Sequence, residues 1–252
     1  MAALFELKEA VMKMYPDVSH YHPVKDWAKV KASCSFLISK ATQGTGYVDP
    51  TLESFISGCE KHGIPYWLYA YLNKGNETAQ TDYLIRTCLN RVGSHFVGFI
   101  LDVEAGNDVG DVKEALKYLA ARTSKIMLYT GFADYEMYKE MIDSRPTNCA
   151  WWEARYGENT GDYSDKYPCH FGADLHQFTS QGICPGISGN CDLNRIVGRE
   201  EAWFTTSKNN DTGVIYTVSV ADLWTRGQAE NLQKQLASRG IIGVVHKVKI
   251  LE

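Results

Sequence analysis

The order of apolar and amphipathic segments predicts an α/β protein: a modified TIM-like β/α barrel followed by a small βαβ C-terminal unit. Over roughly the first 200 of the 252 residues, short apolar runs alternate with helical stretches, which is the pattern of parallel βαβ units. A polar stretch at 205–213 then separates this region from one more strand–helix–strand unit.

The predicted strands are short, buried and regularly spaced, at residues 34–39, 64–72, 96–103, 125–129, 149–154 and 171–178. The predicted helices cover residues 51–62, 79–91, 112–122 and 135–142, and Gly63 is a stop signal for the first of them. At this length the alternation favours a closed barrel. A doubly wound open sheet is the alternative, but its nucleotide-binding form is disfavoured because no Gly-x-Gly-x-x-Gly follows a strand.

Composition divides the chain into four predicted segments. Residues 1–11 resemble a leader or tag-like extension, 12–203 form the barrel, 204–213 a linker and 214–252 the small βαβ module. A unit of about 40 residues rarely folds alone. The module is therefore expected to pack on the barrel or to pair with a second copy of itself, as a wall-binding or dimerisation unit.

Charge and hydropathy exclude several classes of partner. The net charge is -4 and no Lys/Arg-rich block exists, which disfavours nucleic-acid binding. No apolar run approaches the roughly 20 residues of a membrane span. Residues 1–11 lack the basic start and apolar centre of a secretory signal, so we expect cytoplasmic synthesis, a non-standard route outside, or a sequence shown without its leader.

Cysteine and histidine usage gives no clear metal or disulfide signature. The seven cysteines include no Cys-x-x-Cys pair, and most lie in apolar settings typical of reduced core residues. A bridge between Cys184 and Cys191 is a weaker alternative. His20 and His22 form a His-x-His pair that keeps a metal-dependent amidase as a minor alternative. We expect no metal and no cofactor.

The strongest chemical signal is a pair of carboxylates at the end of a buried strand. Asp102 and Glu104 follow the apolar run 96–101 and, two residues apart, face the same side of the strand. In a β/α barrel the carboxyl ends of the strands form the active-site rim. Two close carboxylates raise the proton affinity of one of them, which suits acid and base roles in glycoside hydrolysis. A divalent-metal site is the competing interpretation of this segment alone.

Further acids and aromatic side chains occupy similar places. Asp17 and Asp192 each lie where an apolar stretch meets a turn, although a lone acid there is more often a cap. Tyr69 and Tyr71 share one strand face, and Trp152 ends another strand. Aromatic rings stack on sugars, so together these residues are compatible with a carbohydrate cleft.

Taken together, these segments resemble glycoside hydrolase family 25, the lysozyme family of phage endolysins and bacterial autolysins. The resemblance runs from about residue 15 to 198 and rests on ordered motifs at 17–21, 69–71, 101–104, 152–156, 177–180 and 185–194. It implies a modified β/α barrel that cleaves the β-1,4 bond between N-acetylmuramic acid and N-acetylglucosamine. Ala70 departs from the family, where a His or another larger residue is usual.

The resemblance also implies roles for individual residues. Glu104 is matched to the general acid and base, Asp102 to its partner carboxylate, and Asp17 and Asp192 to two acids on the floor of the site. The implied substrate-lining residues are Tyr69, Tyr71, Tyr129, Trp152, Arg155 and Gln177. The implied outcome is retention, either through direct attack by Asp102 or, as we favour, through attack by the substrate's own N-acetyl oxygen.

Two expectations complete the sequence-based interpretation. The substrate would be peptidoglycan glycan strands, reached outside the cell, whereas a non-catalytic wall-binding protein on the same fold is the alternative. The tail faintly resembles half of a sporulation-related repeat domain, a glycan-binding module, so two chains would supply one half each in a homodimer through residues 214–250.

Overall fold

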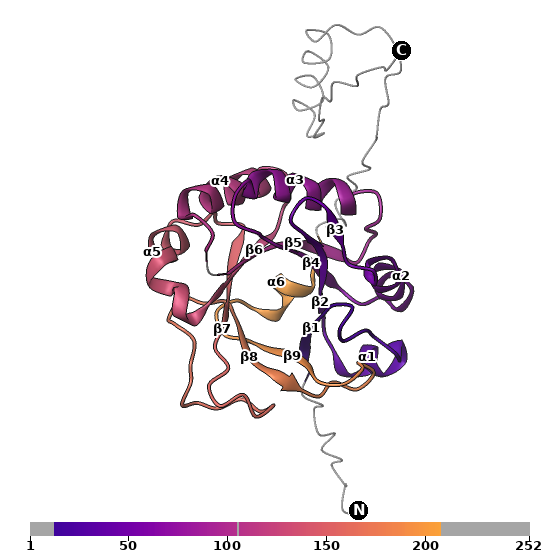
Figure 1. Cartoon of the computed structure of the whole chain (residues 1–252). Helices are drawn as coiled ribbons and strands as arrows, with labels where there is room; N and C mark the ends of the chain where they lie inside the picture. Colours follow the sequence, from indigo (N-terminus) through magenta and orange to yellow (C-terminus); the bar gives the residue numbers. More distant parts are fainter. Residues whose placement is uncertain (1–12, 105, 208–252) are drawn as a thin grey trace, which may run out of the picture. The chain divides into compact units, whose positions relative to one another are not determined.

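The protein was analysed as a computed structural model that describes residues 13–104 and 106–207. The predicted extension at 1–11, the linker residues 208–213 and the module at 214–252 lie outside the described residues. Within the described part of the chain, nine strands form one sheet, and eight of them close into a barrel (Figure 1). The expected barrel is therefore confirmed, and the open sheet is not the fold.

The barrel strands are paired in the order β1, β9, β8, β7, β6, β5, β4 and β2, and β2 returns to β1. Their bounds are β1 Tyr15–Val18, β2 Leu37–Gln43, β4 Tyr66–Tyr71, β5 Phe96–Val103, β6 Ile126–Gly131, β7 Cys149–Ala154, β8 Leu175–Gly182 and β9 Cys191–Ile196. A two-residue strand, β3 (Tyr47–Val48), pairs antiparallel with β2.

One strand breaks the parallel pattern that the sequence predicts. Strand β9 runs antiparallel to both β8 and β1, whereas the other neighbouring barrel strands are parallel. A short turn rather than a helix joins β8 to β9, so the chain reverses direction directly. The beginning of β9 therefore lies at the end of the barrel where the parallel strands finish.

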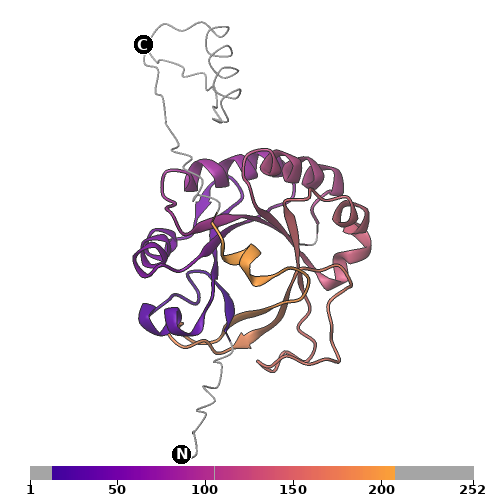
Figure 2. The ribbon, with the colours of Figure 1, turned by 180° about the vertical axis from the view of Figure 1, so that it is seen from behind.

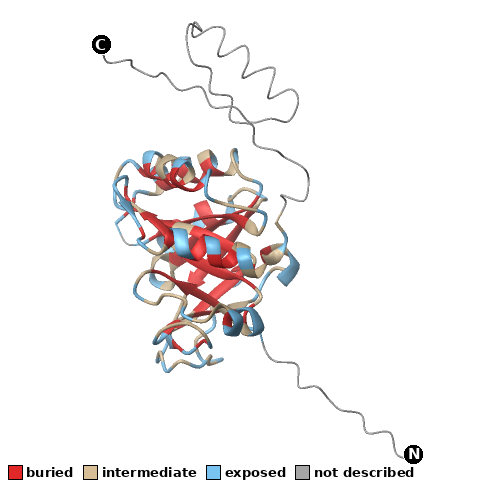
Figure 3. Cartoon of the chain, turned by 90° about the vertical axis from the view of Figure 1, so that its right-hand side faces the viewer, coloured by how far each residue is buried: buried red, intermediate tan, exposed pale blue. Residues whose placement is uncertain are grey.

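Helices cover the outside of the barrel, and their outer faces are exposed while the strands are buried (Figure 3). They are α1 Trp27–Ser33, α2 Leu52–His62, α3 Glu77–Cys88, α4 Val109–Ala120 and α5 Tyr135–Asp143, preceded by a 3-10 turn at Phe132–Asp134. Local signals explain their ends. Asp108 caps α4 by accepting from the Gly110 and Asp111 amides, and Gly63 ends α2 with a φ of 63°.

The predicted elements agree with the structure where the sequence signal is local. The strands β5 and β7 have the predicted bounds, and the four predicted helices exist with ends shifted by up to three residues. The first and sixth predicted strands begin too early: residues 34–36 precede β2, with Cys34 in an isolated bridge to Met14, and residues 171–174 are a turn and a bend before β8. Helix α1 was not predicted from its short, lysine-containing segment.

The amino end of the barrel is closed by α6 (Glu201–Thr205), which lies across the barrel in Figures 1 and 2. Trp67 Nε1 donates to the Phe204 carbonyl at 2.9 Å, and the Phe204 ring stacks on Phe36. Lys125 Nζ donates to the carbonyls of Trp203 and Thr206. Phe204 is fully buried, so the barrel unit continues past residue 203, where the sequence placed its end.

Candidate active site

The inner face of the barrel changes from apolar to polar along each strand. Because side chains alternate across a strand, the residue two positions after each interior apolar residue also points inward. Ile100 is followed in this way by Asp102, Met127 by Tyr129, and Leu175 by Gln177. The apolar positions form the core above α6, whereas the later positions form a polar floor at the carboxyl ends of the strands.

Asp17 is held on this floor by two amide groups. Its Oδ2 accepts from Gln177 Nε2 at 2.9 Å and from Asn194 Nδ2 at 2.8 Å. The other ends of the two amides are also used: Gln177 Oε1 accepts from the hydroxyls of Tyr129 and Tyr156, and Asn194 Oδ1 accepts from a tryptophan indole. The orientation of each amide is therefore fixed, with its donor group toward Asp17.

Asp192 lies directly opposite Asp17 in the antiparallel pair of β1 and β9. Burial, and then the charge of Asp192, raise the pKa of Asp17 well above its usual range. Burial raises the pKa of Asp192 to about 6, with the charge of Asp102 acting in the same direction and a hydrogen bond with Asp17 opposing it. Both carboxyl groups therefore hold a proton more tightly than an exposed aspartate does.

Asp102 and Glu104, the pair predicted from the sequence, lie on either side of Val103, the last residue of β5. Asp102 is 8% exposed, and its buried Oδ1 has no hydrogen-bond partner in the described part of the protein. Glu104 is exposed, one residue beyond the strand, and its Oε2 accepts from the Tyr71 hydroxyl at 3.1 Å. Burial, followed by the charge of Glu104, raises the pKa of Asp102 well above its usual range.

Lys40 is a cation beside this pair that the sequence interpretation missed. It lies on β2, donates to Gln43 Oε1 at 2.6 Å, and sits 5.1 Å from the centre of the Tyr71 ring. Its positive charge lowers the pKa of Asp102 and so opposes the effect of burial. A lysine in an apolar strand gives no local signal of this role, because Tyr71 and Asp102 come from the strands β4 and β5.

The predicted substrate-lining residues divide into three groups. Tyr71 reaches Glu104, and Tyr69 lies among the acids, since burial and then the charge of Asp102 raise its pKa well above the usual range. The second group is Trp152, Tyr129 and Gln177, which are 2%, 9% and 2% exposed. The rings of Trp152 and Tyr129 meet edge to face, and the Tyr129 hydroxyl donates to Gln177. They support the floor and expose little surface to a ligand. The third group consists of Arg155.

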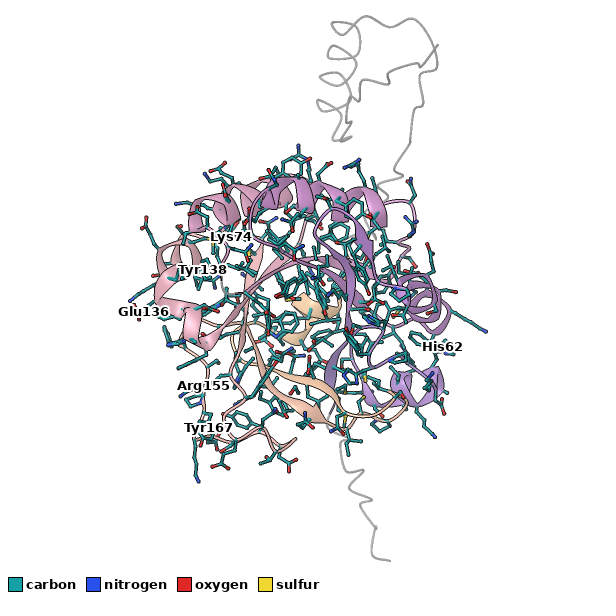
Figure 4. The ribbon with its side chains drawn as sticks, viewed as in Figure 1. His62, Lys74, Glu136, Tyr138, Arg155 and Tyr167 are labelled. Carbon is teal, nitrogen blue, oxygen red and sulfur yellow. The ribbon has the colours of Figure 1, made fainter. Side chains whose placement is uncertain are left out.

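Arg155 contacts the long β7–β8 connection and the 3-10 turn that follows β6. Its guanidinium lies 3.8 Å from the centre of the Phe132 ring and 5.9 Å from that of Tyr167, and it donates to the Pro168 carbonyl. Figure 4 shows Arg155 and Tyr167 next to each other at the edge of the barrel. The structure thus gives Arg155 a role in ordering this connection and does not bring it to the acids.

Two further residues of the site, Asn194 and Tyr156, were not singled out from the sequence as site residues. Asn194 follows Asp192 by two positions on β9, so strand alternation offered a signal once β9 was known to be a strand. Tyr156 lies beyond the end of β7 and reaches the cluster only because its segment turns inward. The sequence of that segment gives no sign of the turn.

Metal binding finds no support in the described residues, where no group of three or more His, Cys, Asp or Glu side chains is arranged to hold an ion. His20 instead bonds Asp49, with Nδ1 at 2.9 Å from Oδ2. In the same part of the chain, no helix is long and apolar enough for a membrane span.

A closed β/α barrel with four carboxylates and an aromatic floor at the carboxyl ends of its strands has the architecture of a glycoside hydrolase. A family model confirms this class: the model described as glycosyl hydrolases family 25 matches residues 16–187, more than half of the chain. The protein therefore belongs to glycosyl hydrolase family 25 and is an enzyme that hydrolyses glycosidic bonds. No curated protein sequence matches the chain.

Solved structures share this fold. The catalytic domain of endolysin ply40 from bacteriophage P40 of Listeria monocytogenes is 24% identical, with a TM-score of 0.63 over 79% of this chain and 95% of that one. A lysozyme from Streptomyces coelicolor is 21% identical, with a TM-score of 0.63 over 80% and 99%. A muramidase from Trichobolus zukalii is 20% identical, with a TM-score of 0.59 over 76% and 98%.

Proposed function

We propose that the protein is an N-acetylmuramidase that cleaves the β-1,4 bond between N-acetylmuramic acid and N-acetylglucosamine in peptidoglycan. The observation that carries the proposal is the Asp102 and Glu104 pair, one acid buried and one exposed, with two further acids beside it. Membership of the family and the lysozymes, muramidases and endolysins among the structures with this fold support the same substrate class.

Glu104 is the residue best placed to act on the scissile oxygen. Its exposure lets a bound sugar chain reach it, and the Tyr71 hydroxyl holds one of its oxygens. In the proposed mechanism Glu104 protonates the leaving oxygen and afterwards deprotonates the incoming water. Tyr71 fixes the carboxyl orientation in both steps.

The mechanism uses Asp102 in its charged form. In the free protein, burial and the charge of Glu104 favour a proton on Asp102, whereas the positive charge of Lys40 favours the carboxylate. We infer that Lys40 keeps the charged form of Asp102 accessible during catalysis.

Charged Asp102 then has one of two roles. It attacks the anomeric carbon directly, or it orients and balances the substrate's N-acetyl group while the acetamido oxygen attacks. We favour the second route, because Asp102 is only 8% exposed, which suits a carboxylate that orients the acetamido group better than one that attacks the ring. Both routes pass through an intermediate that water opens with retention.

The test compares the wild-type protein with Glu104→Gln on purified cell walls, with mass spectrometry of the released fragments. The wild type is expected to give reducing N-acetylmuramic acid ends, and the variant to lose roughly 10²- to 10⁴-fold in rate. Glu136→Gln is the matched control, because Glu136 is exposed on the outer helix α5 (Figure 4). Reducing N-acetylglucosamine ends would contradict the bond assignment, and no release by the wild type would favour the non-catalytic wall-binding alternative.

The choice between the two routes has its own measurement. Walls whose sugars have been de-N-acetylated lack the internal nucleophile, so the substrate-assisted route predicts that they are not cut. Cleavage of these walls at the rate of the acetylated ones would reject that route while leaving the muramidase assignment intact.

The proposal also covers the location of the activity and the oligomeric state of the protein. Its substrate class places its action on the cell wall, outside the cytoplasmic membrane. The suggested homodimer through residues 214–250 stays a prediction, because these residues lie outside the described part. Light scattering of the full chain tests it, and a monomer would contradict it.

A further inference from the structure

Two cysteines far apart in the sequence lie in direct contact. The sulfur atoms of Cys34 and Cys184 are 3.4 Å apart, and 150 positions separate the two residues along the chain. Both side chains are buried and both thiols are free in the structure. The sequence suggested a bridge between Cys184 and Cys191 as a weaker alternative. In the structure, the sulfur of Cys184 contacts that of Cys34.

Both cysteines sit in well-ordered backbone at the place where the barrel closes. The Cys34 amide caps α1 by donating to the Val30 carbonyl at 2.8 Å. The β8–β9 turn that carries Cys184 is tied to the segment before α1, because the Gly186 carbonyl accepts from the amides of Lys25 and Asp26. Gly186 is required there: its φ is +93°, and a Cβ would approach the Asp26 carbonyl oxygen to 2.3 Å.

Cys34 also forms part of the wall of a surface cavity. The cavity has a volume of about 530 Å³, and its other lining residues include Lys13, Lys31 and Glu201. Both lysines are exposed, and each donates to a backbone carbonyl at the edge of this region. The cavity therefore gives a small molecule with carboxylates a way to approach one member of the pair.

We propose that Cys34 and Cys184 are an oxidisable pair that forms an intramolecular disulfide by exchange with a small anionic disulfide such as oxidised glutathione. The two sulfurs already face each other, so closing the bond shortens one contact without bringing distant segments together. The hydrogen bond from Cys34 lowers the pKa of Cys184 and raises that of Cys34, so the thiolate of the pair is favoured on Cys184, which can act as the base for Cys34.

The exchange proceeds in two balanced steps. The Cys34 thiol passes its proton to the Cys184 thiolate as its sulfur attacks one sulfur of oxidised glutathione. The glutathione S–S bond breaks, a mixed disulfide forms on Cys34, and the departing glutathione thiolate takes the proton from Cys184. The Cys184 thiolate then attacks the Cys34 sulfur and releases the second glutathione. The two protein thiols are oxidised, one glutathione disulfide is reduced to two thiols, and the two protons pass to the released thiolates.

The cross-link would distinguish the protein inside a cell from the protein outside it. A reducing cytoplasm keeps both thiols free, whereas an oxidising exterior allows the bond to persist. The closed loop would span most of the barrel, because Cys34 follows α1 and Cys184 precedes the last barrel strand. Restricting so long a loop in the unfolded chain stabilises the folded barrel.

The experiment equilibrates the full chain in glutathione buffers from reducing to oxidising and blocks remaining thiols with a maleimide. Non-reducing peptide mapping then identifies any linked cysteines. We expect one linked pair, containing Cys34 and Cys184, and a rise in Tm on the order of 5–15 °C relative to the reduced protein. The mapping uses the wild-type chain, so the result does not depend on a variant that folds.

Two variants sharpen the test. Cys191→Ala removes a buried neighbouring thiol and is expected to keep both the link and the rise in Tm. Cys184→Ala is expected to lose both and to leave glutathione on Cys34. Free thiols at both positions in the oxidised wild type, a linked pair that includes Cys191, or glutathione remaining on wild-type Cys34 would overturn the proposal.

Discussion

Asp192→Asn is expected to make the barrel more stable at neutral pH while it impairs catalysis. In the wild type, Asp192 faces Asp17 across the β1–β9 pair, and its partial burial disfavours the charged carboxylate. An asparagine keeps the size of the side chain and can donate its amide to Asp17. The substitution therefore removes a charge that burial disfavours and keeps a hydrogen bond with Asp17 at the centre of the site.

The magnitude follows from the pKa of Asp192, which rises from 3.8 to about 6 in the folded protein. Each pKa unit corresponds to about 1.4 kcal/mol, so the full shift would be about 3 kcal/mol. Asp192 is partly exposed, and solvent screening reduces this to about 1–2 kcal/mol. For a domain of this size the Tm would rise by about 2–8 °C.

The pKa shift of Asp192 also fixes the direction in which stability changes with pH. Because the folded-state pKa lies above the unfolded one, the folded state binds more protons between about pH 4 and 6. Wild-type stability therefore falls as pH rises through this window, and the loss is complete above the folded pKa. The advantage of the variant should be small at pH 4, grow up to pH 6 and stay constant above it.

Thermal unfolding followed by circular dichroism between pH 4 and 8 measures this difference. Asp162→Asn serves as the control, since Asp162 is exposed in the β7–β8 connection and should give nearly equal Tm values throughout. A variant less stable than the wild type at pH 7, or an advantage as large at pH 4 as at pH 7, would refute the reasoning.

Two other substitutions test separate parts of the structure. Lys40→Met removes the cation that lowers the pKa of Asp102, so the acidic limb of the pH profile of kcat/KM should move to higher pH. If this limb does not move, ionisation of Asp102 does not control it. Phe204→Ala opens a cavity beneath the core and should lower the free energy of unfolding by about 3–5 kcal/mol, measured by urea titration. Because α6 lies at the opposite end of the barrel from the acids, kcat at low temperature should change less than twofold, and a larger loss would show that the two ends are coupled.

The sequence predicts those parts of the site whose chemistry and position lie in one segment. Asp102 and Glu104 interrupt an apolar run, so their place at a strand end is visible without knowledge of the fold. Asn194 and Lys40 carry no such signal, because their partners come from other strands. The direction of β9 is likewise set by pairing with β8 and β1, and alternation alone does not reveal it.

The contacts of Arg155 show a different limit. Its motif suggests a residue at a strand end near the substrate, but the path of the β7–β8 connection determines its neighbours. Loops follow tertiary contacts more than local propensity, and so their side chains are the least predictable part of a site.

The pairing of the first barrel strand with the last also governs how the site forms during folding. Asp17 and Asp192 come from opposite ends of the barrel sequence and meet only when β9 inserts beside β1. Contacts of such long sequence separation form late and slowly, because the intervening chain must be ordered first. A nascent chain that ends before residue 191 therefore lacks both the final strand and one of the four acids. Catalytic competence would accordingly appear only after almost the whole barrel sequence has left the ribosome.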